Sequence, residues 1–199
     1  MDAIALMLPL LLEFVNSFAP CFTSRGLVHF QYFILAHCGL HGLPHCVTET
    51  MRLTRIHKLM HWTTPYAFMN KGVWSCKLVC QCLLDLLVSR LSVHQEIIVA
   101  VDDTLVKKWG RKFFGLGRYK DPTDKNPGSH KRKVWGHCWV TMALIWECGP
   151  GQWFGFPLAA LLFVPQHACA EDFPFKTKIE LAVMLIERMR WRARRLVIV

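Results

Sequence analysis

The segment 97–104, with the sequence IIVAVDDT, constrains the fold more than any other part of the chain. Its apolar and β-branched residues predict a buried strand that ends at two adjacent carboxylates, Asp102 and Asp103. At a strand end, the strand would fix the carboxylate oxygens and the next loop would leave them open to a hard divalent cation. The alternative is that the two acids and Thr104 form a turn or a helix cap.

A cationic segment directly follows the two acids. Residues 105–135 carry ten Lys and Arg residues against two Asp residues, which accounts for +8 of the chain's formal net charge of +10. Such a block beside carboxylates predicts a polyanionic partner whose phosphates are neutralised by Lys and Arg. The glycines in this segment lack the spacing of a phosphate-binding loop, so we expect a basic loop that binds its partner through its charges. The alternative is that the loop is merely solvated and has no partner.

The first half of the chain has a mostly helical apolar period, and Gly and Pro breaks divide residues 8–91 into four or five short helices. Residues 3–12 are apolar but too short to span a membrane, and Pro9 interrupts them, so we interpret them as the start of a buried helix. A further helix would carry Arg52, Arg55 and Lys58 on one side, as a DNA-reading face or as an ordinary solvated face.

The nine cysteines are an odd number and form no C-x-x-C pair. Without a secretory signal, they predict reduced thiols and a cytoplasmic protein. Cys38, His41, His45 and Cys46 are ligand-type side chains, but the adjacency of the last two makes tetrahedral zinc coordination awkward.

The second half of the chain predicts two long strands, 134–146 and 153–164, joined by a turn at 149–151. A helical period follows over 172–195, and residues 196–199 begin another buried strand. The order is strand, strand, strand, helix, strand, and the last strand should lie parallel to the acidic one. We therefore expect an α+β protein with a helical region at 1–95, which could bind DNA, and a mixed sheet with a crossover helix at 96–199.

Three stretches, VDDTLVKKWG, FGLGRYKDPTDK and GHCWVTMAL, closely resemble insertion-sequence transposases of the DDE superfamily, in the DDE endonuclease group with the pattern D-D-T-x-x-x-K-x-G. The amino-terminal LPLLLEFVNSFAPCFT is similar to the helical region that precedes the core of that family. The resemblance implies a ribonuclease H-like fold, of which this chain would hold the amino-terminal part.

In that family, two Asp and one Glu hold two divalent metal ions, usually Mg²⁺, which cleave and join DNA ends. By the resemblance, Asp103 is the first catalytic and metal-binding Asp, and Asp102 is a neighbour or second-choice ligand. The basic residues implied to contact the DNA backbone are Lys107, Lys108, Arg111, Lys112, Lys131, Arg132 and Lys133. His137 and Trp139 belong to the similar stretch GH-x-WV, with either a packing role or a direct contact.

In the family, the second Asp follows directly after the strand that LVIV begins, and the Glu lies further on. Neither position lies within the 199 residues. We therefore expect a truncated and catalytically incomplete transposase. The alternative is a non-catalytic DNA-binding remnant that occupies transposon ends or inhibits a full-length transposase. The expected partners are DNA with transposon inverted repeats and a second copy or a full-length transposase, and we expect no membrane. A small membrane-associated protein is a third option, motivated by the 53% apolar content.

Overall fold

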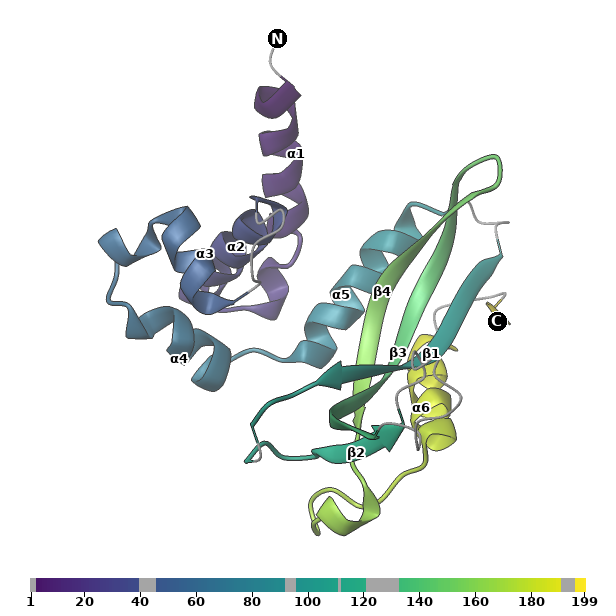
Figure 1. Ribbon diagram of the computed structural model, residues 1–199. Helices are drawn as coiled ribbons and strands as arrows, with labels where there is room; N and C mark the ends of the chain where they lie inside the picture. The colour runs from purple at the N-terminus through teal and green to yellow at the C-terminus, as the bar shows by residue number, and fades with distance from the viewer. Residues whose placement is uncertain (1–2, 40–45, 92–95, 111, 121–132, 191–195) are drawn as a thin grey trace. The chain divides into compact units, whose positions relative to one another are not determined.

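The computed structural model describes residues 3–39, 46–91, 96–110, 112–120, 133–190 and 196–199 (Figure 1). Its contacts divide the chain into two compact units, Met1–Arg90 and Leu91–Val199. The first unit is helical and the second combines a sheet with a helix.

Five α-helices make up the described part of the first unit, in line with the predicted four or five. They are α1 (Ala3–Asn16), α2 (Ser24–Gly39), α3 (Val47–Thr54), α4 (Thr63–Lys71) and α5 (Cys76–Ser89), with 3₁₀ turns η1 (Ala19–Cys21) and η2 (Ile56–Lys58). Aromatic rings form much of the core, where Phe22 stacks on Phe30 at 4.6 Å and Phe68 stacks on Trp74 at 5.7 Å between centroids. The Trp74 indole N–H also donates to the Phe68 carbonyl at 3.0 Å, which fixes the turn between α4 and α5.

In the part of α1 whose side chains the structure describes, residues 9–16, only Val15 is buried, which corrects the prediction of a buried helix start. Val15 and Phe18 are buried, whereas Leu10 is 60% exposed and Phe14 is partly exposed. Phe14 still contacts the buried Phe18 ring edge-on, at 5.3 Å between centroids, so it lies at the border of that core and Leu10 is the more exposed residue. No single helix in the described residues is long and apolar enough to cross a membrane, although α4 and α5, bent by 86° at their break, together have the length and composition of a broken span.

The predicted basic helix face is wrong, because α3 ends at Thr54. Arg55 adopts the left-handed conformation with φ of 53°, so it terminates the helix, and Lys58 follows in the separate turn η2. Arg52 pairs with Glu49 at 3.4 Å. The three cations therefore do not share one helix side.

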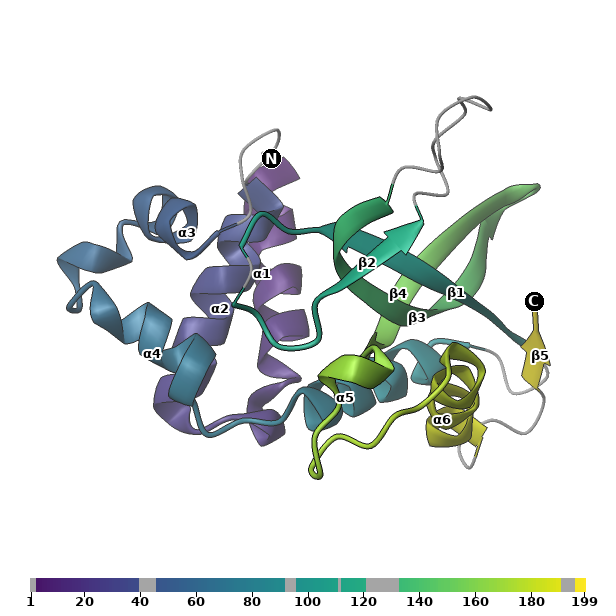
Figure 2. The ribbon, with the colours of Figure 1, turned by 60° about the horizontal axis from the view of Figure 1, so that its bottom comes forward.

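The second unit is built on a five-stranded mixed sheet in the residues that the structure describes. The elements are β1 (Ile97–Lys107), β2 (Gly117–Lys120), β3 (Lys133–Gly149), β4 (Gln152–Phe163), the turn η3 (Gln166–Ala168), α6 (Lys178–Arg190) and β5 (Leu196–Ile198). Strand β3 pairs with β1 on one side and with β2 and β4 on the other, all antiparallel. The hairpin of β3 and β4 is the long green pair in Figure 2.

Strand β5 returns beside β1 after the crossover helix. The two strands run parallel, with Ile97 opposite Leu196 and Val99 opposite Ile198, and the Val199 N–H donates to the Val99 carbonyl at 3.0 Å. The predicted α+β class, the parallel return of the last strand and the ribonuclease H-like strand order are thereby confirmed.

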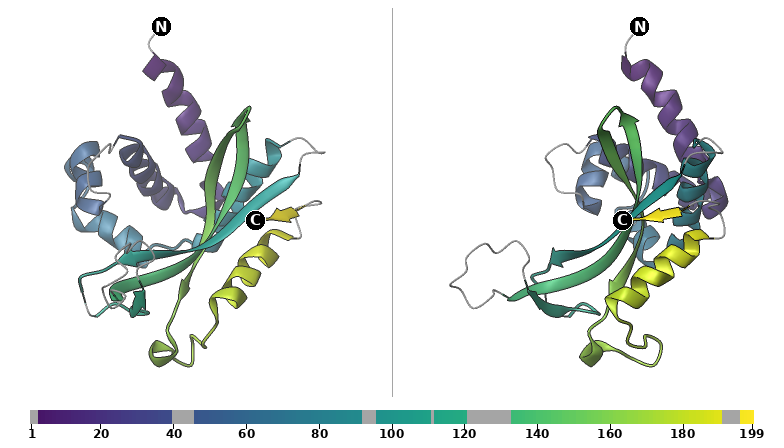
Figure 3. Two further views of the ribbon diagram at one scale, coloured as in Figure 1. Left: turned by 45° about the vertical axis from the view of Figure 1, so that its right-hand side comes forward. Right: turned by 90° about the vertical axis from the view of Figure 1, so that its right-hand side faces the viewer.

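Helix α6 covers one face of this sheet, as Figure 3 shows, and contacts β1, β3 and β4. Leu181 and Leu185 of α6 are buried, together with Val99 of β1 and with Val140 and Leu144 of β3. Since strand side chains alternate between faces, the odd-numbered residues of β1 and the even-numbered residues of β3 point toward the helix.

Three predicted boundaries in this unit are wrong. Strand β1 continues to Lys107, because its hydrogen-bonded ladder with β3 continues to Gly136, so the two acids lie inside the strand and not at its end. Residues 117–120 of the predicted loop form β2, which pairs with the first residues of β3. The helix expected from Asp172 begins at Lys178, after Pro174 and a capping residue at Thr177.

Candidate active site

Asp102 and Asp103 lie on opposite faces of the sheet because adjacent strand residues alternate. Asp103 continues the row of Ile97 and Val99, so its carboxylate lies on the face that α6 covers. Asp102 lies on the other face, level with Thr141 of β3. The structure therefore separates the two carboxylates that the sequence places side by side.

The Asp103 carboxylate has two side-chain partners from distant parts of the chain. The Lys178 ammonium forms an ion pair with Asp103 Oδ2, and the Cys138 thiol donates to the same oxygen at 3.4 Å. Cys138 is buried, whereas the side chains of Asp103 and Lys178 remain 47% and 42% exposed. The carboxylate is thus held from the protein side and open to solvent on the other.

The ion pair favours the charged forms of both Asp103 and Lys178. The hydrogen bond from Lys178 holds the pKa of Asp103 below its usual value, against the opposing effect of partial burial. For Lys178, burial is the largest cause and disfavours the ammonium, but the hydrogen bonds and charge interactions with Asp103 and Cys138 together outweigh it, so the pKa is raised. Burial raises the pKa of the Cys138 thiol, so this residue acts as a neutral hydrogen-bond donor. At neutral pH the site consists of a carboxylate, an ammonium and a thiol.

A capping box at the start of α6 positions Lys178. The Thr177 hydroxyl lies 3.2 Å from the Glu180 N–H, and the Glu180 carboxylate accepts from the Thr177 N–H at 2.6 Å and from its hydroxyl at 2.8 Å. This reciprocal arrangement is the capping box of the pattern T-x-x-E. The sequence analysis missed Lys178, although this pattern at Thr177 would have placed it in the first turn of the crossover helix.

Asp102 is tied to its own strand. Its Oδ1 accepts from the Asp103 N–H at 2.7 Å, and its carbonyl accepts from the Thr141 hydroxyl at 3.1 Å. Thr141 also lies 3.5 Å from the Thr104 hydroxyl. These contacts give Asp102 a local role in the β1–β3 pairing and do not bring its carboxylate to that of Asp103.

The basic residues predicted to contact DNA lie at the far end of β1 and around β2. Lys107 ends β1, and the Lys108 N–H donates to the Trp135 carbonyl at 3.1 Å. Lys112 is exposed in the segment that leads to β2, and Lys133 opens β3 opposite Lys120. The structure does not describe the other three predicted contacts, which are Arg111, Lys131 and Arg132.

His137 is buried, and its contacts are those of a packing residue. Its Nε2 donates to the Phe114 carbonyl at 2.8 Å, and its ring meets Phe113 and Trp139 edge-on at 6.4 and 6.2 Å between centroids. These contacts hold the segment before β2 against β3, and they favour the packing role over a direct contact with a ligand.

The carboxylate of Asp103 suits a divalent cation by its oxygen donors and its exposure. No group of three or more His, Cys, Asp or Glu side chains gathers as a metal site in the part of the chain that the structure describes. The residues in place therefore supply one ligand, next to a lysine, and do not complete a two-metal centre. The cluster considered for zinc has two of its members, His41 and His45, outside the described residues.

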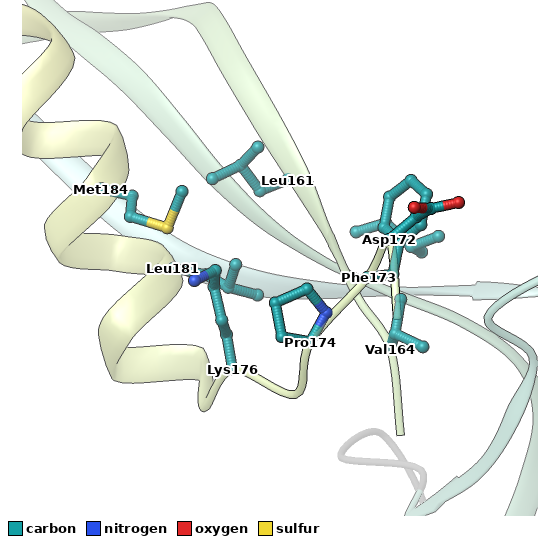
Figure 4. Close-up of a pocket in the computed structure, with 9 residues that line it drawn as sticks. Leu161, Val164, Asp172, Phe173, Pro174, Lys176, Leu181 and Met184 are labelled. Atoms are coloured by element: carbon teal, nitrogen blue, oxygen red, sulfur yellow. The ribbon is translucent and has the colours of Figure 1, made fainter. Parts of the chain in front are cut away.

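A cavity of about 240 Å³ lies apart from this carboxylate, beside α6 (Figure 4). Its lining includes Leu161 of β4, Val164 just after that strand, Phe173, and Leu181 and Met184 of α6. The Asp172 carboxylate, also at its edge, points away from Met184. The lining is mainly apolar and includes neither Asp103 nor Lys178.

A family model described as DDE superfamily endonuclease matches residues 51–199, from α3 to β5. The chain belongs to the DDE superfamily endonucleases. No curated protein and no solved structure matches significantly. Membership of the DDE endonuclease family implies that the substrate is DNA. Enzymes of this superfamily generally use divalent metal ions. The match includes the strand that carries Asp103 and the helix that carries Lys178.

Proposed function

We propose that the chain acts on DNA as a transposase-type DDE endonuclease, with Asp103 as its first catalytic carboxylate and Mg²⁺ as its metal. The observation that carries the proposal is the position of Asp103, on the central strand β1 and half open to solvent, within the matched family region. Transposon ends are the proposed target, and a second copy or a full-length transposase is the proposed protein partner.

The chain's own residues would then have two tasks. Lys178 keeps the Asp103 carboxylate charged and oriented through its ion pair. The cations after β1, including Lys107, Lys108 and Lys112, would bind the DNA backbone without regard to sequence. Asp102 faces away from this site, so we assign it no ligand role.

A second function, DNA binding without cleavage, is favoured by one observation. Among the described residues, Asp103 belongs to no group of three or more His, Cys, Asp or Glu side chains, and Lys178 already compensates its charge. A chain of this kind would occupy transposon ends and block a full-length transposase by mixed assembly.

One experiment tests both functions. The 199-residue chain is incubated with a plasmid that contains the DNA flanking its coding sequence, in Mg²⁺, in Mn²⁺ or in EDTA, and both DNA binding and nicking are followed. Nicking that needs the metal, is lost in Asp103→Asn and persists in Asp102→Asn is the result expected for the endonuclease. Salt-dependent binding without nicking in any of these conditions would establish the second function. The absence of DNA binding even at low salt would overturn both.

A further inference from the structure

Trp109 has the most exposed large apolar side chain among the residues that the structure describes, at 97%. It lies two residues after the end of β1 at Lys107, in the segment that leads to β2. Single apolar residues on a surface are common, so exposure alone carries no function. What distinguishes Trp109 is how its backbone is held and which charges surround it.

One residue of β3 fixes the backbone on both sides of Trp109. The Lys108 N–H donates to the Trp135 carbonyl at 3.1 Å, and the Trp135 indole N–H donates to the Gly110 carbonyl at 3.0 Å. The Phe113 ring packs so close to Gly110 that a Cβ there would lie 2.6 Å from it. The segment is thus pinned to the sheet while the Trp109 indole projects into solvent.

The held backbone favours stacking on the Trp109 ring. Because the backbone is already ordered, binding has to order only the two side-chain torsions of the indole, which keeps the loss of conformational entropy small. A nucleobase offers a flat π-face to such a ring, and base stacking on aromatic side chains tolerates any sequence.

The surrounding charge selects a polyanion. Residues 104–120 contain six Lys and Arg residues and no Asp or Glu, and two of the cations directly precede Trp109. The side chains of Lys112 and Phe113 are also exposed in this segment. An exposed indole among cations is the combination that binds unpaired nucleic acid, through phosphate neutralisation and base stacking together.

The distance from Asp103 sets where on the DNA this contact would fall. Trp109 is six residues further along an extended segment, which spans at most about 20 Å at the rise of a β-strand. Since successive base pairs are about 3.4 Å apart along DNA, this span corresponds to about six nucleotides.

We propose that Trp109 stacks on an unpaired DNA base up to about six nucleotides from the phosphate that lies at Asp103. The inference rests on the proposed function, because it takes DNA as the ligand. It adds a recognition of unpaired or frayed DNA that the backbone-binding lysines do not provide.

The test compares two DNA probes, a 30-nucleotide oligo(dT) strand and a blunt duplex of the same length, bound to the full chain at several salt concentrations. Trp109→Ala should weaken oligo(dT) binding about 5- to 150-fold, the range measured for one lost stacking contact. It should leave duplex affinity and the salt dependence nearly unchanged, and Trp109→Phe should retain most of the oligo(dT) affinity. The matched control is Trp153→Ala, since Trp153 is also exposed but lies opposite Glu147 in the β3–β4 hairpin.

Several outcomes separate this inference from the function on which it rests. Unchanged oligo(dT) binding by Trp109→Ala, with duplex binding intact in the wild type, would overturn the stacking role alone. An equal effect of Trp153→Ala would also overturn it. A change in sedimentation of Trp109→Ala without a change in DNA affinity would show that the indole serves a protein interface instead. Failure of the wild type to bind either DNA would overturn both the stacking role and the proposed function.

Discussion

Lys178 donates to the carboxylate of Asp103 across 75 residues of sequence. The contact joins the first turn of the crossover helix α6 to the middle of the central strand β1. The charge of the proposed catalytic carboxylate therefore depends on where α6 begins.

Removing the ammonium should raise the pKa of Asp103. The hydrogen bond from Lys178 is the largest cause of the lowered value, so Lys178→Ala should return the pKa toward about 3.9, the usual value for Asp. The measurement is a pH titration of the Asp103 side-chain carboxyl carbon by NMR. Lys176→Ala, two residues earlier, is the control and should leave the titration unchanged. An unchanged pKa in Lys178→Ala would show that the ion pair does not form in solution.

The ion pair should contribute only modestly to stability, because both side chains are nearly half exposed. A double-mutant cycle of Asp103→Asn and Lys178→Met should give a coupling of about 0.2–1 kcal/mol in urea denaturation at neutral pH and low salt. High salt should reduce it.

The same coupling should depend on pH at both extremes. The folded pKa of Asp103 is lowered, so its contribution is complete above the unfolded pKa of about 3.9 and is lost as the pH falls through the folded value. The folded pKa of Lys178 is raised, so its contribution is complete below about pH 10.4 and is lost as the pH rises through the folded value. A coupling that stays constant from pH 2 to pH 7 would contradict this assignment.

The capping box should stabilise the start of α6. Thr177→Ala removes the oxygen that lies 3.2 Å from the Glu180 N–H and should lower the free energy of unfolding by about 0.5–2 kcal/mol. Thr177→Ser keeps the hydroxyl and serves as the control. If both variants unfold at the same urea concentration, the helix begins elsewhere.

Gly136 should be intolerant of any side chain. A Cβ at this position would lie 2.3 Å from the Val106 carbonyl oxygen, at the point where β3 pairs with β1 on one side and with β2 on the other. Gly136→Ala should therefore destabilise the sheet by about 1–3 kcal/mol, the usual cost of overpacking. Gly155→Ala in β4 meets only ordinary contacts at 3.7 Å and should change stability by about 0.5 kcal/mol or less. Thermal melts of the two variants give the comparison, and equal melting temperatures would contradict the close strand approach.

Sequence reasoning recovered the elements whose patterns are local. The apolar run before Asp102 predicts a strand, and the crossover helix predicts a parallel return, which β5 makes beside Ile97. It misjudged the end of β1, because two adjacent acids interrupt the apolar run, whereas the pairing with β3 continues past them through Leu105 and Val106 to Lys107. It also missed β2, which is four residues long and exists through its pairing with β3.

The amino-acid sequence by itself determined that an apolar strand leads into two adjacent acids and that a dense cationic segment follows them. Only the tertiary structure decided which acid is the candidate ligand. Alternation along a strand sends Asp102 and Asp103 to opposite faces, and nothing local distinguishes those faces. Helix α6 distinguishes them, because it covers one face and brings Lys178 to Asp103, while the pairing with β3 places Cys138 on the same face.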